Sequence, residues 1–402
     1  MKRFKYTFIS SLVVFLLSLT CNVKAQQHSQ NNKSDSIQIS LLTCGPGEEI
    51  YSLYGHTAIR FHDLKNNNDL VINYGMFSFS QRFFILRFVF GLTDYEMGIM
   101  PFNAFMEEYE SDRRWVKEQV LNITLQDKMK IAMAIENNYL PENRTYRYNY
   151  FYDNCTTRAR DILINNISGT VETQDNQHVN SSYRKEIHKW NWNHCWARWG
   201  NDLLLGVKAD RSINGNELQF LPDNLSKDWK TVKIKYADGK TYPFISQEHY
   251  LIGNNTSSTE NNANDLNIFN PYTLICAIIV IILLSSWKKK THPLPYKIIM
   301  WCVWLTTGLC GIIITTMIFS QHPTVSLNLQ ILLLNPLNLG MLIPALARNK
   351  KYNFTILACL ILFLLGAFIQ SYADGLEYLA FILLIVSQRD LLSQLLKSKK
   401  QQ

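Results

Sequence analysis

Phe151-Tyr-Asp-Asn-Cys-Thr-Thr-Arg-Ala-Arg-Asp161 places a cysteine directly after a turn-prone Asp-Asn pair, at the start of a run with apolar residues at helical spacing. The run predicts a helix whose first turn holds Cys155, capped by Asp153 or Asn154. Unpaired backbone N–H groups and the positive end of the helix dipole favour thiolate over thiol at such a position. The stretch therefore predicts a nucleophilic cysteine, although a lone cysteine is more often a small buried apolar group.

A second stretch, Tyr54-Gly-His-Thr-Ala-Ile-Arg-Phe61, offers a base for this thiol. Its alternation predicts a strand with His56 at its start, and the polar segment 63–69 predicts a hairpin that continues into a strand over 70–74. The second strand then brings Asn73 and Tyr74 beside the first. A histidine that accepts the proton of a thiol, oriented by a third polar group, is the arrangement of papain-like enzymes.

The N-terminal and central segments differ in composition. Residues 1–25 have a basic start, an apolar core and a small-residue ending, the order of an export signal, and cleavage after Ala25 is expected. Lipoprotein processing at Cys21 and an uncleaved membrane anchor are the alternatives. Residues 26–252 hold no apolar run long enough to cross a bilayer and predict an exported domain. Residues 253–270 are almost wholly polar and predict a linker.

The C-terminal segment, 271–402, predicts a membrane domain of five transmembrane helices. Its apolar runs are Tyr272–Trp287, Ile298–Phe319, Leu327–Ala347, Phe354–Gln370 and Leu376–Val386. Lys and Arg occur in alternate loops and after the last run, so we expect the first span to start outside and the C-terminus to be cytoplasmic. The formal net charge of +8 lies largely in these loops, so it indicates topology and not a nucleic-acid partner.

The cysteines of the exported segment are Cys44, Cys155 and Cys195, an odd number. In an oxidising compartment at least one of them stays unpaired. A Cys44–Cys195 bridge would leave Cys155 free, and three reduced thiols are the alternative. The sequence has no Cys/His spacing of metal-site type and no phosphate-cradling glycine loop, so neither a metal nor a cofactor is expected.

Other segments carry local signals. Thr124 is a capping residue before an apolar stripe, and a helix is expected over 124–138. Alternating tyrosines over 146–150 predict a strand that runs into the cysteine turn. The aromatic run 77–91 fits a buried core segment, or else a wall for an acyl chain or a membrane-contacting face. The tryptophan cluster 190–199 fits a lipid interface or core packing.

The order of the histidine and the cysteine resembles one branch of papain-like enzymes. His56 precedes Cys155 by 99 residues (155 minus 56), the reverse of papain. This order resembles the circularly permuted NlpC-type branch, which includes lecithin retinol acyltransferase, and implies an α+β fold. The orienting group of that branch lies on the strand after the histidine, where this chain has Asn73 or Tyr74 in place of a second histidine. Asn73 is expected in this role because its amide oxygen can accept the imidazole N–H, and His62 is the alternative.

Whole stretches resemble the Lnb-type lipoprotein N-acyltransferases. They are Gly47-Glu48, Tyr54–Arg60, Asn73–Phe77, Tyr148–Tyr150, Asp153–Arg158, Arg160-Asp161, His322-Pro323 and Asn335-Pro336. The resemblance covers nearly the entire chain after the export signal. It implies a multi-pass inner-membrane enzyme whose periplasmic domain moves a fatty acyl chain from a phospholipid to the N-terminal amine of a diacylated lipoprotein, through a thioester.

The same resemblance implies roles for individual residues. Cys155 is expected as the nucleophile, His56 as the general base and Asn73 as the orienting group. The residues expected to bind substrates are Tyr54, Tyr74, Asn154, Arg158 and His322. Arg158 would meet a phospholipid phosphate, or else pair with a carboxylate. The expected partners are the phospholipid donor, the lipoprotein acceptor and the membrane, without nucleic acid.

Two other functions fit the same residues. A cysteine peptidase or amidase acting on the cell wall would use the same Cys-His pair, and it predicts a hydrophilic cleft and activity of the severed exported domain. A non-catalytic membrane receptor or scaffold with an inherited fold predicts that loss of Cys155 leaves function intact.

Overall fold

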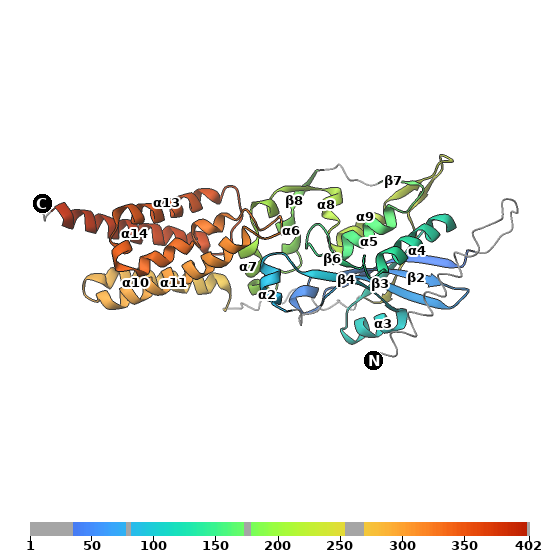
Figure 1. Cartoon of the computed structure of the whole chain (residues 1–402), viewed down its shortest axis with the longest axis horizontal. Coiled ribbons are helices and arrows are strands. Elements are labelled where there is room, and N and C mark those ends of the chain that lie inside the picture. Colours follow the sequence, from blue (N-terminus) through green and yellow to red (C-terminus); the bar gives the residue numbers. More distant parts are fainter. Residues whose placement is uncertain (1–34, 78–81, 173–177, 254–268, 400–402) are drawn as a thin grey trace. The chain divides into compact units, whose positions relative to one another are not determined.

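The computed structural model of the chain describes residues 35–77, 82–172, 178–253 and 269–399 (Figure 1). The expected export signal, 1–25, and nearly all of the expected linker, 253–270, lie outside these ranges. The described residues form a section of mixed sheet and helix up to residue 253 and a helical section from residue 269.

A seven-stranded antiparallel sheet organises the first section, in the order β12-β5-β1-β2-β3-β4-β6. Its strands are β1 (Ile37–Cys44), β2 (His56–Asp63), β3 (Asn68–Met76), β4 (Asp94–Pro101), β5 (Val116–Leu121), β6 (Thr145–Arg147) and β12 (Ile245–Ile252). The expected hairpin is confirmed, because β2 and β3 pair with Asp63 opposite Asn68 and Ala58 opposite Asn73.

Different helices cover the two faces of this sheet. They are α4 (Leu125–Tyr139), α5 (Cys155–Ile164) and α9 (Pro222–Trp229) on one side, and α3 (Phe102–Ser111) on the other. Successive strand residues alternate between the faces. Ile59 and Ile72 pack with the helix α5, whereas Ala58 and Val71 pack with Phe105 of α3. Full burial of an isoleucine side chain contributes about 1.5–3 kcal/mol, so this contact holds α5 firmly against the β2–β3 hairpin.

Two local predictions can be compared with these elements. The helix expected over 124–138 is confirmed as α4, and the Thr124 side chain accepts the backbone N–H of Asp127 as its cap. The strand expected over 146–150 is shorter, because the chain turns after β6 and Asn149 forms an isolated bridge with Asp153.

The first section also contains smaller elements. They are η1 (Ile50–Ser52), α2 (Phe84–Val89), β7 (Thr170–Glu172), β8 (His178–Ser182), α6 (Tyr183–His188), α7 (Cys195–Leu204), η2 (Val207–Ala209), β9 (Ser212–Asn214), α8 (Gly215–Leu218), β10 (Lys233–Lys235) and β11 (Thr241–Pro243). Phe83 and Leu86 of the aromatic run 77–91 are exposed, so the interpretation of that run as buried core is wrong at these two positions. Residues 78–81 lie outside the described ranges.

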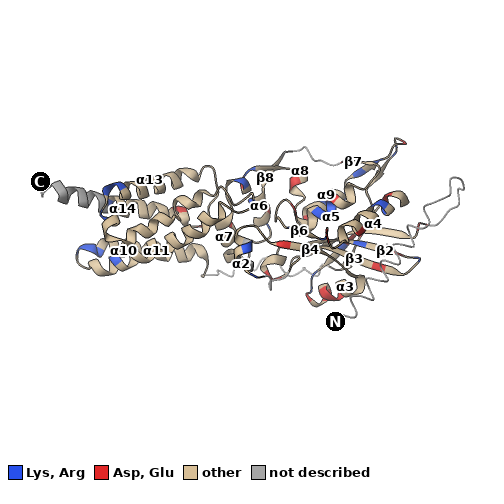
Figure 2. Ribbon diagram, viewed as in Figure 1, with Lys and Arg blue, Asp and Glu red and all other residues tan. Residues whose placement is uncertain are grey.

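The helical section packs around its own apolar core. Its elements are α10 (Pro271–Trp287), η3 (Lys288–Lys290), α11 (Pro293–Met317), η4 (Leu329–Leu332), η5 (Pro336–Leu342), α12 (Pro344–Ala347), α13 (Lys350–Gly366) and α14 (Leu376–Lys399). Among the described residues, two helices are long and apolar enough to cross a membrane, over Pro271–Lys290 and Pro293–Met317. Figure 2 shows basic residues where α10 passes into α11, the place of the lysines of η3.

The third expected span is corrected by the structure. Leu327–Ala347 forms η4, η5 and α12 and not one continuous helix. Pro336 and Pro344 each begin a new element, because proline lacks the N–H that a continuing helix requires. Irregular backbone at membrane depth requires protein partners for its polar groups. Asn338 supplies such contacts, since its amide nitrogen donates to the Thr307 hydroxyl of α11 at 2.9 Å and to the Leu333 carbonyl at 2.8 Å.

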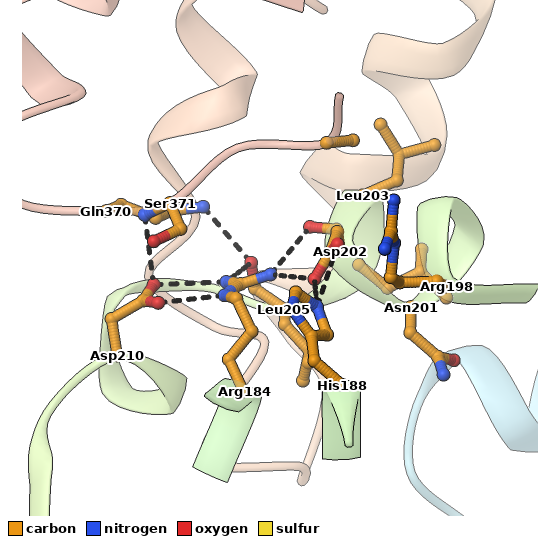
Figure 3. Close-up of polar contacts among 12 residues, drawn as sticks. Arg184, His188, Arg198, Asn201, Asp202, Leu203, Leu205, Asp210, Gln370 and Ser371 are labelled. Carbon is orange, nitrogen blue, oxygen red and sulfur yellow. Dashed lines mark hydrogen bonds and ion pairs between the residues drawn. The ribbon is translucent and has the colours of Figure 1, made fainter. Parts of the chain in front are cut away.

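A buried polar network joins α6 and α7 to the loop between α13 and α14 (Figure 3). Arg184 donates to the Asp202 carboxylate at 2.7 Å and to the Asp210 carboxylate at 2.8 Å. The backbone N–H of Ser371 donates to Asp210 at 3.2 Å, and the Gln370 amide donates to the Leu205 carbonyl at 3.1 Å. The network therefore ties residues of the first section to the helical section.

The tryptophan cluster 190–199 lies at the same junction. The Trp199 ring packs against the core of the helical section, and its N–H donates to the Asp374 carbonyl at 3.1 Å. Arg198 pairs with the Asp374 carboxylate at 2.7 Å, whereas Trp192 is 70% exposed. Within the described residues, Trp199 is thus the member of this cluster that packs against the core of the helical section.

Candidate active site

The hairpin β2–β3 places the histidine and its orienting group. Asn73 lies opposite Ala58, so it is a diagonal neighbour of His56 on the adjacent strand. Asn73 Oδ1 is 2.9 Å from His56 Nε2, and Asn73 Nδ2 contacts Met100 Sδ at 3.3 Å. With the amide oxygen towards the ring, Nε2 carries the proton that is donated, which leaves Nδ1 as the basic nitrogen.

The helix α5 begins at Cys155, as expected, and Asn154 is its cap. The Asn154 side-chain oxygen accepts the backbone N–H groups of Thr156 and Thr157, each at 2.9 Å, and a full capping box is present. The Asn154 amide nitrogen donates to the carbonyls of Tyr150 and Phe220. Every polar atom of this side chain therefore serves to fix the start of the helix.

The thiol and the imidazole interact directly. Burial alone raises the pKa of the Cys155 thiol, but the charge and hydrogen bond of His56, the Thr57 backbone N–H and the Thr156 hydroxyl outweigh burial and hold that pKa below its ordinary value. Burial lowers the pKa of His56, whereas the charge of Cys155 and hydrogen bonds to Cys155 and Asn73 raise it above its ordinary value. Opposite shifts of this kind favour a thiolate–imidazolium pair.

A threonine pair attaches α5 to β2 at this point. Thr57 Oγ1 and Thr156 Oγ1 lie 3.0 Å apart, and both side chains are buried. The contact holds the first turn of the cysteine helix against the first residues of the histidine strand. Sequence reasoning missed both threonines, because nothing in a threonine side chain signals a partner 99 residues away.

The three cysteines of the first section are all unpaired in the structure, so the possible Cys44–Cys195 bridge is not formed. Cys44 lies in β1 inside the core, where burial, only partly offset by the Tyr109 hydrogen bond, raises the pKa of its thiol to about 12. The pKa of Cys155 is lowered instead, so of these two thiols Cys155 ionises more readily. Among the described residues, no group of acidic, histidine or cysteine side chains could hold a metal ion.

The two tyrosines expected to bind substrate are engaged within the fold. The Tyr54 hydroxyl accepts from Asn191 at 3.1 Å and from Asn201 at 2.9 Å. The Tyr74 side chain is buried, and its hydroxyl accepts from Asn138 at 3.1 Å. Both side chains thus contribute contacts between elements of the first section.

Arg158 pairs with a carboxylate, which was one of its two expected roles. Its guanidinium donates to both carboxylate oxygens of Asp153, at 2.5 and 2.8 Å, and lies over the Tyr146 ring at 3.5 Å. Arg158 and Asp153 line a pocket between α4 and α5 together with Asn138 and Tyr152. Asp153 thus neutralises the charge that the alternative role, contact with a phosphate, would use.

His322 lies beside the loop that follows α2. A side-chain carbon built on Gly91 would be 3.1 Å from His322 Cδ2. Burial and then the charge of Arg147 lower the pKa of His322. Arg147 belongs to β6 and donates to the side chain of Gln321 at 2.7 Å. His322 is thereby placed next to the strand that leads into the cysteine turn.

Two family models match the chain. The model of the Lnb N-terminal periplasmic domain matches residues 24–188, which include His56, Asn73 and Cys155, and the model of the Lnb transmembrane domain matches residues 262–399. No curated protein and no solved structure matches the chain. The chain is thus an inner-membrane protein with a periplasmic domain followed by a transmembrane domain.

The two matches together identify the family. The chain belongs to the Lnb family, and this membership indicates a membrane enzyme that modifies lipoproteins.

Proposed function

We propose that the chain is a cysteine-dependent acyltransferase that moves a fatty acyl chain from a phospholipid to the N-terminal amine of a diacylated lipoprotein. One observation carries this proposal: the Cys155 thiol, whose pKa is lowered, contacts the His56 imidazole, which Asn73 holds at 2.9 Å. In this proposal the periplasmic domain has a circularly permuted papain-like fold. The proposal includes a signal over 1–25, a catalytic domain over 26–252, a linker over 253–270 and five spans over 271–402. The third of these spans, Leu327–Ala347, is broken into short elements.

The first half-reaction transfers the acyl group to the enzyme. The Cys155 thiolate attacks the ester carbonyl of the phospholipid, and a tetrahedral oxyanion forms. When it collapses, the carbonyl–oxygen bond breaks, His56 gives its proton to the departing lysophospholipid, and an acyl thioester remains on Cys155. Asn73 keeps the imidazole ring oriented during this proton transfer.

The second half-reaction delivers the acyl group to the lipoprotein. Neutral His56 removes a proton from the attacking amine, whose nitrogen forms the amide bond as the carbon–sulfur bond breaks. Cys155 leaves as the thiolate, and the pair returns to its starting state. In this proposal the Cys155 backbone N–H donates to both oxyanions. The Asn154 side-chain oxygen accepts the N–H groups of the next two residues and so does not compete for that of Cys155.

The experiment that tests this function uses cells that lack their own lipoprotein N-acyltransferase. They express the parent chain, the Cys155→Ala variant or a Cys195→Ala control, and mass spectrometry reads the N-terminal peptides of their lipoproteins. We expect the third acyl chain with the parent and with the control, and its absence with Cys155→Ala. Unmodified lipoproteins in all three strains, with each chain present in the membrane, would refute the proposal and favour cell-wall peptides as the substrate.

A further inference from the structure

A buried hydroxyl beside the candidate nucleophile finds no hydrogen-bond partner in the described part of the chain. Tyr146 lies in β6 and is 7% exposed, and no donor or acceptor among the described residues contacts its Oη atom. An unsatisfied buried polar group costs about 1–3 kcal/mol. A fold that only needed an aromatic ring at this position would avoid the cost with phenylalanine, so the hydroxyl calls for another explanation.

The hydroxyl faces the same small space as the cysteine. Gly75 has φ +92°, and a side-chain carbon built on it would lie 3.7 Å from Cys155 Cβ, 3.7 Å from Tyr148 Cε2 and 4.0 Å from Tyr146 Oη. These are ordinary van der Waals distances. Because Gly75 has no side chain, a space about the size of one methyl group remains between the three residues. A carbonyl attacked by Cys155 can place its oxygen there.

The position of the Tyr146 ring is fixed from two directions. Tyr146 pairs with Tyr95 across β6 and β4. On one face the ring carries the Arg158 guanidinium at 3.5 Å, which Asp153 holds in a two-pronged ion pair. Donors that are held in place before charge develops stabilise a transition state without a reorganisation cost.

The hydroxyl also keeps its proton. Burial, followed by the nearby charge of Cys155, raises the pKa of Tyr146 far above its ordinary value. Tyr146 can therefore donate a hydrogen bond at any pH at which the thiolate–imidazolium pair exists.

We propose that Tyr146 is a further catalytic residue, whose hydroxyl donates a hydrogen bond to the oxyanion formed when Cys155 attacks an acyl carbonyl. This inference rests on the proposed function and adds a side-chain donor to the Cys155 backbone N–H. The hydrogen bond forms only when the negative oxygen appears, so its energy lowers the barrier and does not tighten substrate binding. It acts in both half-reactions, because each passes through a tetrahedral oxyanion.

The test compares Tyr146→Phe with the parent as purified full-length proteins in phospholipid vesicles. The measured quantities are the rate at which Cys155 becomes acylated, the rate of Cys155 alkylation by iodoacetamide, and the unfolding temperature. We expect acylation to slow by about 10²- to 10³-fold, as on loss of one oxyanion donor. Alkylation involves no oxyanion and should keep the parent's rate. The unfolding temperature should stay the same or rise, because an unsatisfied buried atom is removed.

Tyr236→Phe is the matched control. Its hydroxyl donates to Asp127 at 3.0 Å, so its loss should lower the unfolding temperature and leave acylation unchanged. Acylation of Tyr146→Phe at the parent's rate overturns the inference. An equal loss of acylation and alkylation also overturns it, because the substitution would then have lowered the reactivity of the Cys155 thiol itself. A parent chain that never acylates Cys155 refutes the proposed function itself, a result that is distinct from either outcome for Tyr146.

Discussion

Asn73 Oδ1 lies 2.9 Å from His56 Nε2 across the β2–β3 hairpin. The amide oxygen accepts a hydrogen bond from the imidazole N–H. Because the amide carries no charge, it orients the ring without binding the proton strongly. The strand register alone produces this contact, because the two positions are diagonal neighbours on adjacent strands. The hairpin thus sets the orientation of the His56 ring.

The pH dependence of acyl transfer should follow this contact. The rate at which Cys155 becomes acylated is expected to rise as Cys155 loses its proton through its lowered pKa, and to fall as His56 loses its proton through its raised pKa. The Asn73 hydrogen bond is one cause of the raised pKa, so Asn73→Ala should move the alkaline limb to lower pH. Asn73→Asp should move it to higher pH, because a carboxylate favours the imidazolium. The rate with Asn73→Ala should fall on the order of 10²-fold, and pH–rate profiles of the purified variants would show whether the limbs move in opposite directions.

Thiol reactivity should separate Cys155 from Cys44. At neutral pH, iodoacetamide is expected to modify Cys155 first and to leave Cys44 untouched, because burial raises the pKa of Cys44 to about 12. In His56→Ala, the pKa of Cys155 should rise, since the charge that lowers it is gone and burial remains. Peptide mass spectrometry over a pH series measures both thiols in one sample. Equal alkylation of Cys155 in the parent and in His56→Ala would contradict the thiolate–imidazolium pair.

The space at Gly75 can be filled by a single methyl group. Gly75→Ala should abolish acylation, because its Cβ would occupy the gap between Cys155 and Tyr146. Gly239→Ala is the control, since Gly239 has φ +78° but nothing within 4 Å of the position of its Cβ. Each variant places a side chain at positive φ, at a cost of about 1–2 kcal/mol, so the two should lose similar stability. Retained acylation in Gly75→Ala would show that the carbonyl does not enter this space.

The buried arginine of α6 should matter more for stability than an exposed one. Arg184 is 2% exposed, and its removal leaves the Asp210 carboxylate without a guanidinium and Asp202 with His188 alone (Figure 3). Arg184→Gln should therefore lower the free energy of unfolding by about 3–5 kcal/mol. Arg211→Gln breaks the more exposed pair with Glu217 and should cost about 0–1 kcal/mol. Thermal unfolding in detergent compares the two variants, and equal shifts would argue against a structural role for the network.

Local signals in the sequence were sufficient for several elements. The Asp-Asn-Cys turn predicts the start of α5, because a cap acts through N–H groups within three residues of it. Alternation and a polar turn predict the β2–β3 hairpin, and the resemblance to the NlpC-type branch then points to Asn73 as the partner of His56. Arg158 had two interpretations, and its pairing with Asp153 confirms the carboxylate partner. These predictions succeeded because each depends on residues close in the sequence or on one strand register.

The sequence by itself determined the cysteine helix, the histidine hairpin and the apolar character of the C-terminal segment. Only the tertiary structure decided which groups meet at Cys155: the Thr57 N–H and the space at Gly75, with the unsatisfied hydroxyl of Tyr146 beside it. It also decided that Leu327–Ala347 is broken into short elements, of which η5 is bonded to Thr307 of α11 through the Asn338 amide. The physical reason is that capping and alternation act between near neighbours, whereas the burial and satisfaction of a polar atom depend on every element that packs around it.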